Sequence, residues 1–231
     1  KNSIPFESVM SKVWNDKIFK HIQTNVDLAS KKLSNERGAC PDAEEYGFKE
    51  RFSNKTAIAP TASISIICGG ASPGVEPVAA NSYTHKTLSG SYNVRNRYLK
   101  KVLEKYEKND DETWSTITTN QGSVEHLDFL SRNEKDVFKT AFELNQKWIV
   151  ELGADRTPYI SQAQSINIFL PADVHKKELH QIHFQAWKKG LKSLYYCRSK
   201  SIQRAENINN GLSAETSTKE NEDNDECLSC Q

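Results

Sequence analysis

The 231-residue sequence has little of what marks several large classes of protein. Its formal net charge is only +1, and its Lys and Arg residues are scattered among acids, so no basic stripe predicts capture of nucleic acid. No apolar run approaches the ~20 residues that span a bilayer, and the first residues lack the charged-then-apolar pattern of a secretion signal. We therefore expect a cytoplasmic protein with no nucleic-acid partner and no membrane partner.

Cysteine is also scarce, with five residues in the chain. An odd number at wide spacings is not the dense, even set of a secreted disulfide scaffold. Only Cys227 and Cys230 lie close together, in a CxxC pair. The remaining cysteines are expected to be packing thiols: Cys40, Cys68 and Cys197. The 36% hydrophobic content is enough for a chain of this length to bury a core.

Apolar periodicity predicts several helices. Residues 6–33 carry large apolar side chains three or four positions apart, which indicates an amphipathic helical region with room for one break. Gly38 should mark its end. Further helices are expected over 97–108 and over 134–152, the latter with Gly153 as its C-cap.

Two stretches have the composition of strands. Residues 56–74 combine Ile and Ala with Thr and Ser and end in glycines, which indicates a buried strand followed by a small-residue loop. Residues 165–171 alternate polar and apolar side chains and stop at a proline. A helix capped by Asp173 and burying Trp187 should follow, and a further strand should begin near Leu194. Strands that alternate with helices predict an α/β fold containing parallel strands.

The chain changes character at about residue 207. From there to residue 231 the sequence is mainly Asn, Ser, Thr and Glu, and it cannot bury enough apolar surface to offset the entropy of ordering. We therefore divide the chain into a folded body, 1–206, and a disordered acidic tail, 207–231, that ends in the CxxC pair.

The pair Cys227 and Cys230 can serve in redox exchange or form half of a zinc site. Zinc would need two more ligands, and no second CxxC or nearby His pair supplies them. His180 and His183 could share a helix face, but they lack a third ligand and fit a solvated face better. A flexible arm of ~30 residues wanders over roughly 30 Å, which suits electron transfer more than metal binding.

Two other features are ambiguous from the residues alone. Hydroxyls and free backbone N–H groups over residues 60–65 can cradle phosphate oxygens, although a strand edge with small polar residues is the simpler explanation. Tyr195 and Tyr196 should point to opposite faces of a strand, and neighbouring tyrosines usually serve in core or interface packing.

Taken together and in order, these stretches resemble the large subunit of class I ribonucleotide reductase, most closely its bacteriophage forms. The matching segments are 36–41 (ERGACP), 60–65 (PTASIS), 74–77 (GVEP), 87–90 (TLSG), 156–160 (RTPYI), 164–170 (QSINIFL), 191–196 (LKSLYY) and the terminal dithiol. The resemblance implies the C-terminal portion of a ten-stranded α/β barrel, completed by a missing N-terminal portion. In that family a thiyl radical abstracts hydrogen from the ribose of a ribonucleoside diphosphate, which is then reduced for DNA synthesis.

The resemblance also implies a role for each candidate residue. The substrate diphosphate would lie against Pro60, Thr61, Ala62, Ser63 and Ile64. Tyr195 and Tyr196 would relay the radical from the small subunit to the active-site cysteine. Cys227 and Cys230 would re-reduce the barrel disulfide and pass the oxidation on to thioredoxin or glutaredoxin.

The sequence departs from the family in one large respect. The Asn-x-Cys-x-Glu radical segment, the reducible barrel cysteine pair and the N-terminal regulatory regions are absent from it. The chain should therefore be inactive alone, as an excerpt or as one half of a split subunit that needs an N-terminal large-subunit portion and the radical-bearing small subunit.

No cofactor would bind this chain in that interpretation. The radical metal centre would lie in the small subunit, and allosteric nucleotides would bind the missing portion. The alternative is a non-catalytic docking module whose tail carries out thiol–disulfide exchange, and a zinc-binding structural protein is a third class.

Overall fold

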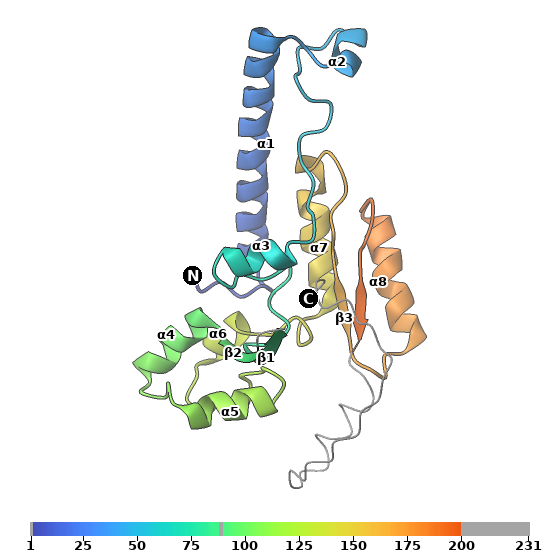
Figure 1. The fold of residues 1–231 in the computed structure, drawn as a ribbon. Helices are drawn as coiled ribbons and strands as arrows, with labels where there is room; N and C mark the ends of the chain where they lie inside the picture. Colours follow the sequence, from blue (N-terminus) through green and yellow to red (C-terminus); the bar gives the residue numbers. More distant parts are fainter. Residues whose placement is uncertain (1, 88–89, 200–231) are drawn as a thin grey trace.

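The computed structural model describes residues 2–87 and 90–199, so the predicted boundary at residue 206 and the acidic tail lie outside it (Figure 1). No helix within these ranges is long and apolar enough to cross a membrane. In chain order the elements are α1 (Val9–Arg37), α2 (Pro41–Glu45), α3 (Ala62–Ile67), β1 (Ser82–Thr87), β2 (Gly90–Arg95), α4 (Arg97–Lys105), α5 (Asp111–Thr119), α6 (Arg132–Val137), α7 (Gln146–Arg156), the 3-10 turn η1 (Thr157–Tyr159), β3 (Ile168–Leu170), α8 (Lys176–Lys188) and β4 (Cys197–Ser199).

The segment 164–170 has a parallel neighbour along one edge. Ile58 donates its N–H to the carbonyl of Ala163 at 3.2 Å and accepts from the N–H of Ser165 at 2.8 Å. These bonds form a parallel bridge between Ile58 and Gln164. The bridge places the start of the predicted phosphate segment beside the strand.

The same segment has a second parallel neighbour. Tyr195 donates its N–H to the carbonyl of Ile166 at 2.8 Å, and Ile168 donates to the carbonyl of Tyr196 at 2.9 Å. β3 then pairs in parallel with β4. Backbone groups of successive residues point to opposite edges of a strand. Ala163 and Ser165 bond the first neighbour and Ile166 and Ile168 bond the second, so the two neighbours lie on opposite edges. The predicted α/β class with parallel strands is confirmed, whereas the ten-stranded barrel stays a prediction.

A first hydrophobic cluster packs β3 against α7 and α8. All residues of β3 are buried, as expected for a parallel strand covered on both faces. The buried members of the cluster are Ala141, Leu144, Ile149, Val150, Ile166, Ile168, Phe169, Leu170, Ile182 and Ala186.

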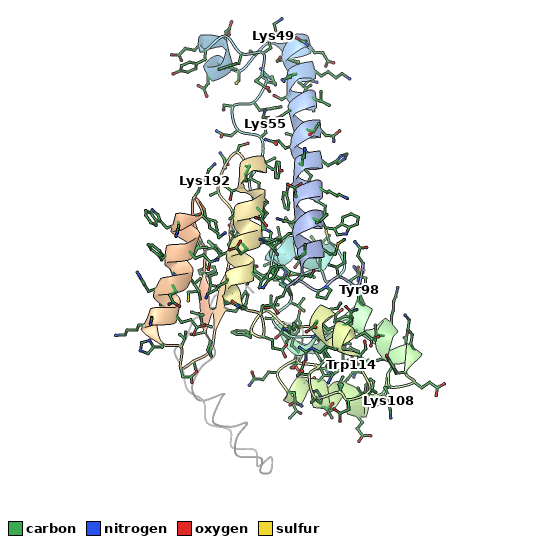
Figure 2. All side chains as sticks on the ribbon, turned by 180° about the vertical axis from the view of Figure 1, so that it is seen from behind. Lys49, Lys55, Tyr98, Lys108, Trp114 and Lys192 are labelled. Atoms are coloured by element: carbon green, nitrogen blue, oxygen red, sulfur yellow. The ribbon has the colours of Figure 1, made fainter. Side chains whose placement is uncertain are left out.

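A second cluster joins α4, α5 and α6, which lie near the antiparallel hairpin β1–β2 (Figure 1). Trp114 is 1% exposed and lies inside this group of helices (Figure 2). The buried members are Leu99, Leu103, Trp114, Ile117, Val124, Leu127, Leu130 and Phe138. The sequence patterns predicted α4 but neither the hairpin nor α5.

The N-terminal helix follows its prediction in position but not in packing. α1 is continuous, without the break that the pattern allowed, and ends at Gly38, whose φ of +81° suits glycine. Its buried residues are Ser30 and Ser34, so none of the large apolar side chains of α1 belongs to the buried clusters.

The prediction of one helix over 134–152 is wrong. The chain turns between α6 and α7, because Asn145 caps a new helix by accepting from the N–H of Lys147. Gly153 lies inside α7 and is not its C-cap. A Cβ there would lie 2.7 Å from Cδ1 of Ile166, so glycine allows the strand to pack closely on α7.

Four further local predictions are corrected. Residues expected in a strand form the short helix α3. His175, and not Asp173, caps α8, and Trp187 on that helix is 73% exposed instead of buried. β4 begins at Cys197, a few positions after the expected start at Leu194.

Truncation of a buried β3 residue should test the first cluster. Ile168 is 1% exposed, so Ile168→Ala should lower the free energy of unfolding by about 2–5 kcal/mol through lost burial and a residual cavity. Ile67→Ala is a matched control, because Ile67 is 85% exposed and its truncation should change stability by less than ~0.5 kcal/mol. Urea unfolding of both variants gives the comparison, and equal losses would contradict the packing described.

Candidate functional site

The predicted phosphate segment forms the first turn of α3 and the residues before it. Thr61 is the N-cap, and its N–H and Oγ1 donate to the carbonyl of Pro73 at 3.1 and 2.9 Å. Helix geometry leaves the first-turn N–H groups, those of Ala62, Ser63 and Ile64, without acceptors inside the helix. The turn is therefore fastened at Thr61, while its backbone donors stay available to a ligand.

The loop that receives Thr61 folds back on Glu76. Ser72 Oγ donates to the carbonyl of Glu76 at 2.5 Å, closing a short turn. A Cβ on Gly74 would collide with Oε2 of Glu76, so a larger residue here would require the carboxylate to move. The turn brings the Glu76 carboxylate from the loop to the edge of the strand.

At that edge the Glu76 carboxylate accepts a hydrogen bond that a neighbouring strand would otherwise accept. The carbonyl of Ile58 accepts from the N–H of Ser165, but the chain then turns toward α3. It therefore offers no backbone acceptor to the next N–H on the same edge, which belongs to Asn167. Glu76 Oε1 accepts from this N–H at 2.6 Å, and Oε2 accepts from Asn167 Nδ2 at 3.4 Å. Gln146 Oε1 accepts from the N–H of Phe169, the next backbone donor on this edge, at 2.8 Å. Side-chain acceptors thus satisfy backbone groups that would otherwise be buried unpaired.

Burial controls the charge of Glu76. The residue is 4% exposed, and this loss of hydration raises the pKa of its carboxyl group. The hydrogen bonds from Asn167 and the positive charge of Arg156 oppose the rise without cancelling it.

Arg156, at the end of α7, lies in the same buried region. It is 3% exposed, and burial lowers its pKa to about 10, although the charges of Glu76 and Asp155 oppose this shift. Its Nε donates to Gln164 Oε1 at 2.6 Å, and its Nη1 donates to Asn15 Oδ1 at 3.3 Å. The guanidinium therefore links α1, α7 and the strand segment.

One polar atom in this region is unsatisfied. Among the described residues, Asn167 Oδ1 is a buried side-chain atom with no hydrogen-bond partner. An unpaired buried acceptor costs roughly 1–3 kcal/mol, so this atom has capacity for one more hydrogen bond.

The predicted tyrosine pair lies just before β4. The ring centroids of Tyr195 and Tyr196 are 4.1 Å apart, with a 55° angle between the ring planes. The prediction of opposite faces is wrong because both residues precede the regular strand, where side chains would alternate. The side chains are 45% and 42% exposed, and the Arg198 guanidinium lies 5.6 Å from the centre of the Tyr196 ring. The phenols thus touch each other and remain accessible.

The structure places two of the three predicted site groups around one strand. Residues 60–64 follow the bridge on one edge of 164–170, and the tyrosine pair binds the other edge. Cys227 and Cys230, the third group, lie outside the described residues.

Sequence motifs did not identify the residues that connect these groups. Glu76, Arg156, Gln164 and Asn167 lie in stretches that carried the family resemblance, but no local pattern assigned them a role. The available signal was the presence of a charged residue beside apolar or glycine-rich sequence, as at Glu76.

The described residues bear on two other predictions, those of metal ligands and of packing cysteines. Within 2–87 and 90–199 no group of three or more His, Cys, Asp or Glu side chains is placed to hold a metal ion. Cys68 and Cys197 are exposed, so the expectation that they are packing thiols is wrong, whereas Cys40 is partly buried.

Comparison with known proteins identifies relatives from one family. A family model described as "Ribonucleotide reductase, barrel domain" matches residues 41–197. The chain is 48% identical over 212 residues to the ribonucleoside-diphosphate reductase large subunit of Invertebrate iridescent virus 6, covering 90% of this chain and 22% of that protein. It is 39% identical over 231 residues to the corresponding subunit of Invertebrate iridescent virus 3, covering 99% of this chain and 36% of that protein.

A solved structure is similar as well. The Actinobacillus ureae class Id ribonucleotide reductase alpha subunit matches with a TM-score of 0.80 and 36% identity, over 89% of this chain and 37% of that chain. The chain thus spans 22% to 37% of the length of these relatives. The expected resemblance to viral forms is supported, and the narrower bacteriophage assignment stays a prediction.

The raised pKa of Glu76 predicts a specific pH dependence. A carboxyl group whose pKa is higher in the folded state binds its proton more tightly there, so its favourable contribution is complete below the unfolded pKa of ~4.3 and is lost as the pH rises through the folded pKa. Glu76→Gln removes this titration and keeps an oxygen for the N–H of Asn167. The difference in unfolding free energy, wild type minus Glu76→Gln, should fall as the pH rises from 4.5 to 8.

Urea unfolding at several pH values measures this difference. Glu112→Gln is the control for loss of a carboxylate at an exposed position in α5. A difference for Glu76→Gln that stays constant, or that grows with pH, would contradict the raised pKa.

Proposed function

The chain belongs to the ribonucleotide reductase barrel-domain family, and we propose that it forms part of the large subunit of a ribonucleoside-diphosphate reductase. The completed enzyme reduces ribonucleoside diphosphates to deoxyribonucleoside diphosphates by radical chemistry, for DNA synthesis in the cytoplasm. The observation that carries the proposal is the pairing of segment 164–170, with the phosphate segment beside one edge and the tyrosine pair on the other.

The substrate diphosphate binds at Pro60, Thr61, Ala62, Ser63 and Ile64 in this proposal. The first turn of α3 supplies backbone donors, and the hydroxyl of Ser63 adds another polar group. The two hydrogen bonds that Thr61 donates to the carbonyl of Pro73 support this role, because they fix the turn before a ligand arrives.

Tyr195 and Tyr196 relay the radical from the small subunit. The centroid distance of 4.1 Å supports the relay, because transfer between phenols requires close approach. Their partial exposure leaves them accessible to groups supplied by the rest of the assembly.

Cys227 and Cys230 act as the shuttle dithiol, which reduces the barrel disulfide and is itself reduced by thioredoxin or glutaredoxin. The remaining components come from other parts of the enzyme. An N-terminal large-subunit portion supplies the radical cysteine and the allosteric nucleotide sites, and the small subunit holds the radical metal centre.

Reconstitution tests this proposal. The chain is co-expressed with the portion of the Invertebrate iridescent virus 6 large subunit that lies outside the matched region, and the small subunit of that virus is added. Formation of deoxynucleotide should require all components. Tyr196→Phe should reduce turnover at least ~100-fold, because phenylalanine cannot carry the phenoxyl radical, whereas Tyr92→Phe, at an exposed tyrosine in β2, should retain activity.

A folded complex that forms no deoxynucleotide, beside an active intact viral subunit, would overturn the proposal. Unchanged disulfide exchange by Tyr196→Phe in such an inactive complex would favour the alternative of a docking module with a thiol carrier tail.

The tail dithiol gives a separate prediction. Cys227→Ser and Cys230→Ser should each abolish repeated turnover supported by thioredoxin, because the shuttle needs both thiols to form a disulfide. Turnover with a small dithiol such as dithiothreitol should persist, since that reductant can diffuse to the barrel disulfide. Cys68→Ser removes an exposed cysteine and should keep both activities. Full thioredoxin-supported turnover by the tail variants would rule out the shuttle.

A further inference from the structure

Helix α1 contacts its neighbour through polar groups. Lys12 Nζ lies 3.2 Å from a carboxylate oxygen of Glu151 and 3.5 Å from one of Asp155 on α7. Asn15 Nδ2 donates to the carbonyl of Leu152 at 2.9 Å. The side of α1 that faces α7 is therefore held by ion pairs and hydrogen bonds.

The same polar character continues along the helix. The hydroxyl of Tyr159 in η1 donates to Asp16 Oδ1 at 2.5 Å. The buried residues of α1 are two serines, Ser30 and Ser34. An amphipathic helix normally buries its large apolar side chains, whereas no large apolar side chain of α1 is fully buried.

The large apolar side chains of α1 form an exposed ridge at Met10, Trp14, Ile18 and Ile22. These residues are 52%, 42%, 47% and 40% exposed. A spacing of four places successive members next to each other along one side of a helix. At 1.5 Å per residue the ridge is about 18 Å long.

The fold offers this ridge no sheet to cover it. In α/β proteins a helix buries its apolar stripe against a sheet or another helix. The main neighbours of α1 within the described residues are α7 and η1, and α7 lies between α1 and β3 (Figure 1). Contiguous exposed apolar side chains of this kind mark an interaction surface.

We propose that the ridge Met10–Trp14–Ile18–Ile22 is the docking surface for the portion of the reductase large subunit that this chain does not contain. The inference rests on the proposed function and adds the face at which assembly occurs. The structurally similar alpha subunit supports this occupant, because the match covers 89% of this chain but only 37% of that one. Most of such a subunit therefore lies outside this fold and is available to cover its exposed faces.

A second copy of this chain is the competing occupant. A ridge of four side chains on one helix is small beside the ~1,200–2,000 Å² that stable protein interfaces bury. A complementary portion of a barrel can surround several faces at once, so the ridge then forms one part of a larger interface.

Charge insertion into the ridge tests the proposal. Tagged wild-type chain, Trp14→Glu and Ile18→Glu are each co-expressed with the viral large-subunit portion described above, and the amount that co-purifies is measured. Each ridge variant should lower recovery of the complex at least ~10-fold, because burial of a charge replaces burial of an apolar side chain. Ser115→Glu adds the same charge at an exposed position of α5 and should not lower recovery.

Two further measurements keep the result interpretable. Thermal unfolding of each variant alone should match the wild type, since the ridge residues are about half exposed. Hydrogen exchange of wild-type peptides from 9–24 should slow in the complex, independently of any substitution.

The outcomes separate this inference from the proposed function. Equal recovery of ridge variants and wild type, with deoxynucleotide formed, would overturn the docking surface and leave the reductase function intact. Ridge-dependent assembly without deoxynucleotide would support the surface and overturn the function. Absence of a wild-type complex, or a dimer of this chain alone that the ridge variants disrupt, would overturn the docking proposal.

Discussion

The hydrogen bond from the Asn167 N–H to the Glu76 carboxylate is the interaction on which the candidate site depends. It joins two backbone regions at the point where the chain leaves the strand edge and turns into α3. On the loop side, the Ser72–Glu76 turn presents the carbonyl of Pro73 to Thr61. On the strand side, the same contact satisfies a buried backbone donor. Loss of this carboxylate therefore breaks the link between the loop and the strand.

The buried charges explain why this connection is specific as well as stable. Burial disfavours the charged forms of both Glu76 and Arg156, and each partly offsets the cost of the other. Arg156 is held in turn by Gln164 in the strand segment. An apolar pair of similar volume could fill the space, but it could not accept from the N–H of Asn167. The polar groups fix which loop meets which residue of the strand.

Local patterns predicted the parts of the fold that local physics determines. Gly38 ends α1 because a positive φ favours glycine, and the alternation in 165–171 predicted β3. The helix expected over 134–152 divides because Asn145 caps a new helix. The spacing of apolar residues carries no information about such a cap. The position of Glu76 depends on a contact 91 residues away in sequence, so its role could not be predicted from spacing. Strand alternation predicted that Tyr195 and Tyr196 point to opposite faces, and it therefore missed the contact between their rings.

Glu76 holds the phosphate segment and the tyrosine-bearing segment in one framework. Amide hydrogen exchange in Glu76→Ala, followed residue by residue by NMR, tests it most directly. Exchange should accelerate at the Thr61 N–H, which donates to Pro73, and at the Tyr195 N–H, which donates to the strand, while Trp114 in the second cluster keeps its wild-type rate. Unchanged exchange at Thr61 and Tyr195, or equal acceleration at Trp114, would show that Glu76 does not connect these two segments.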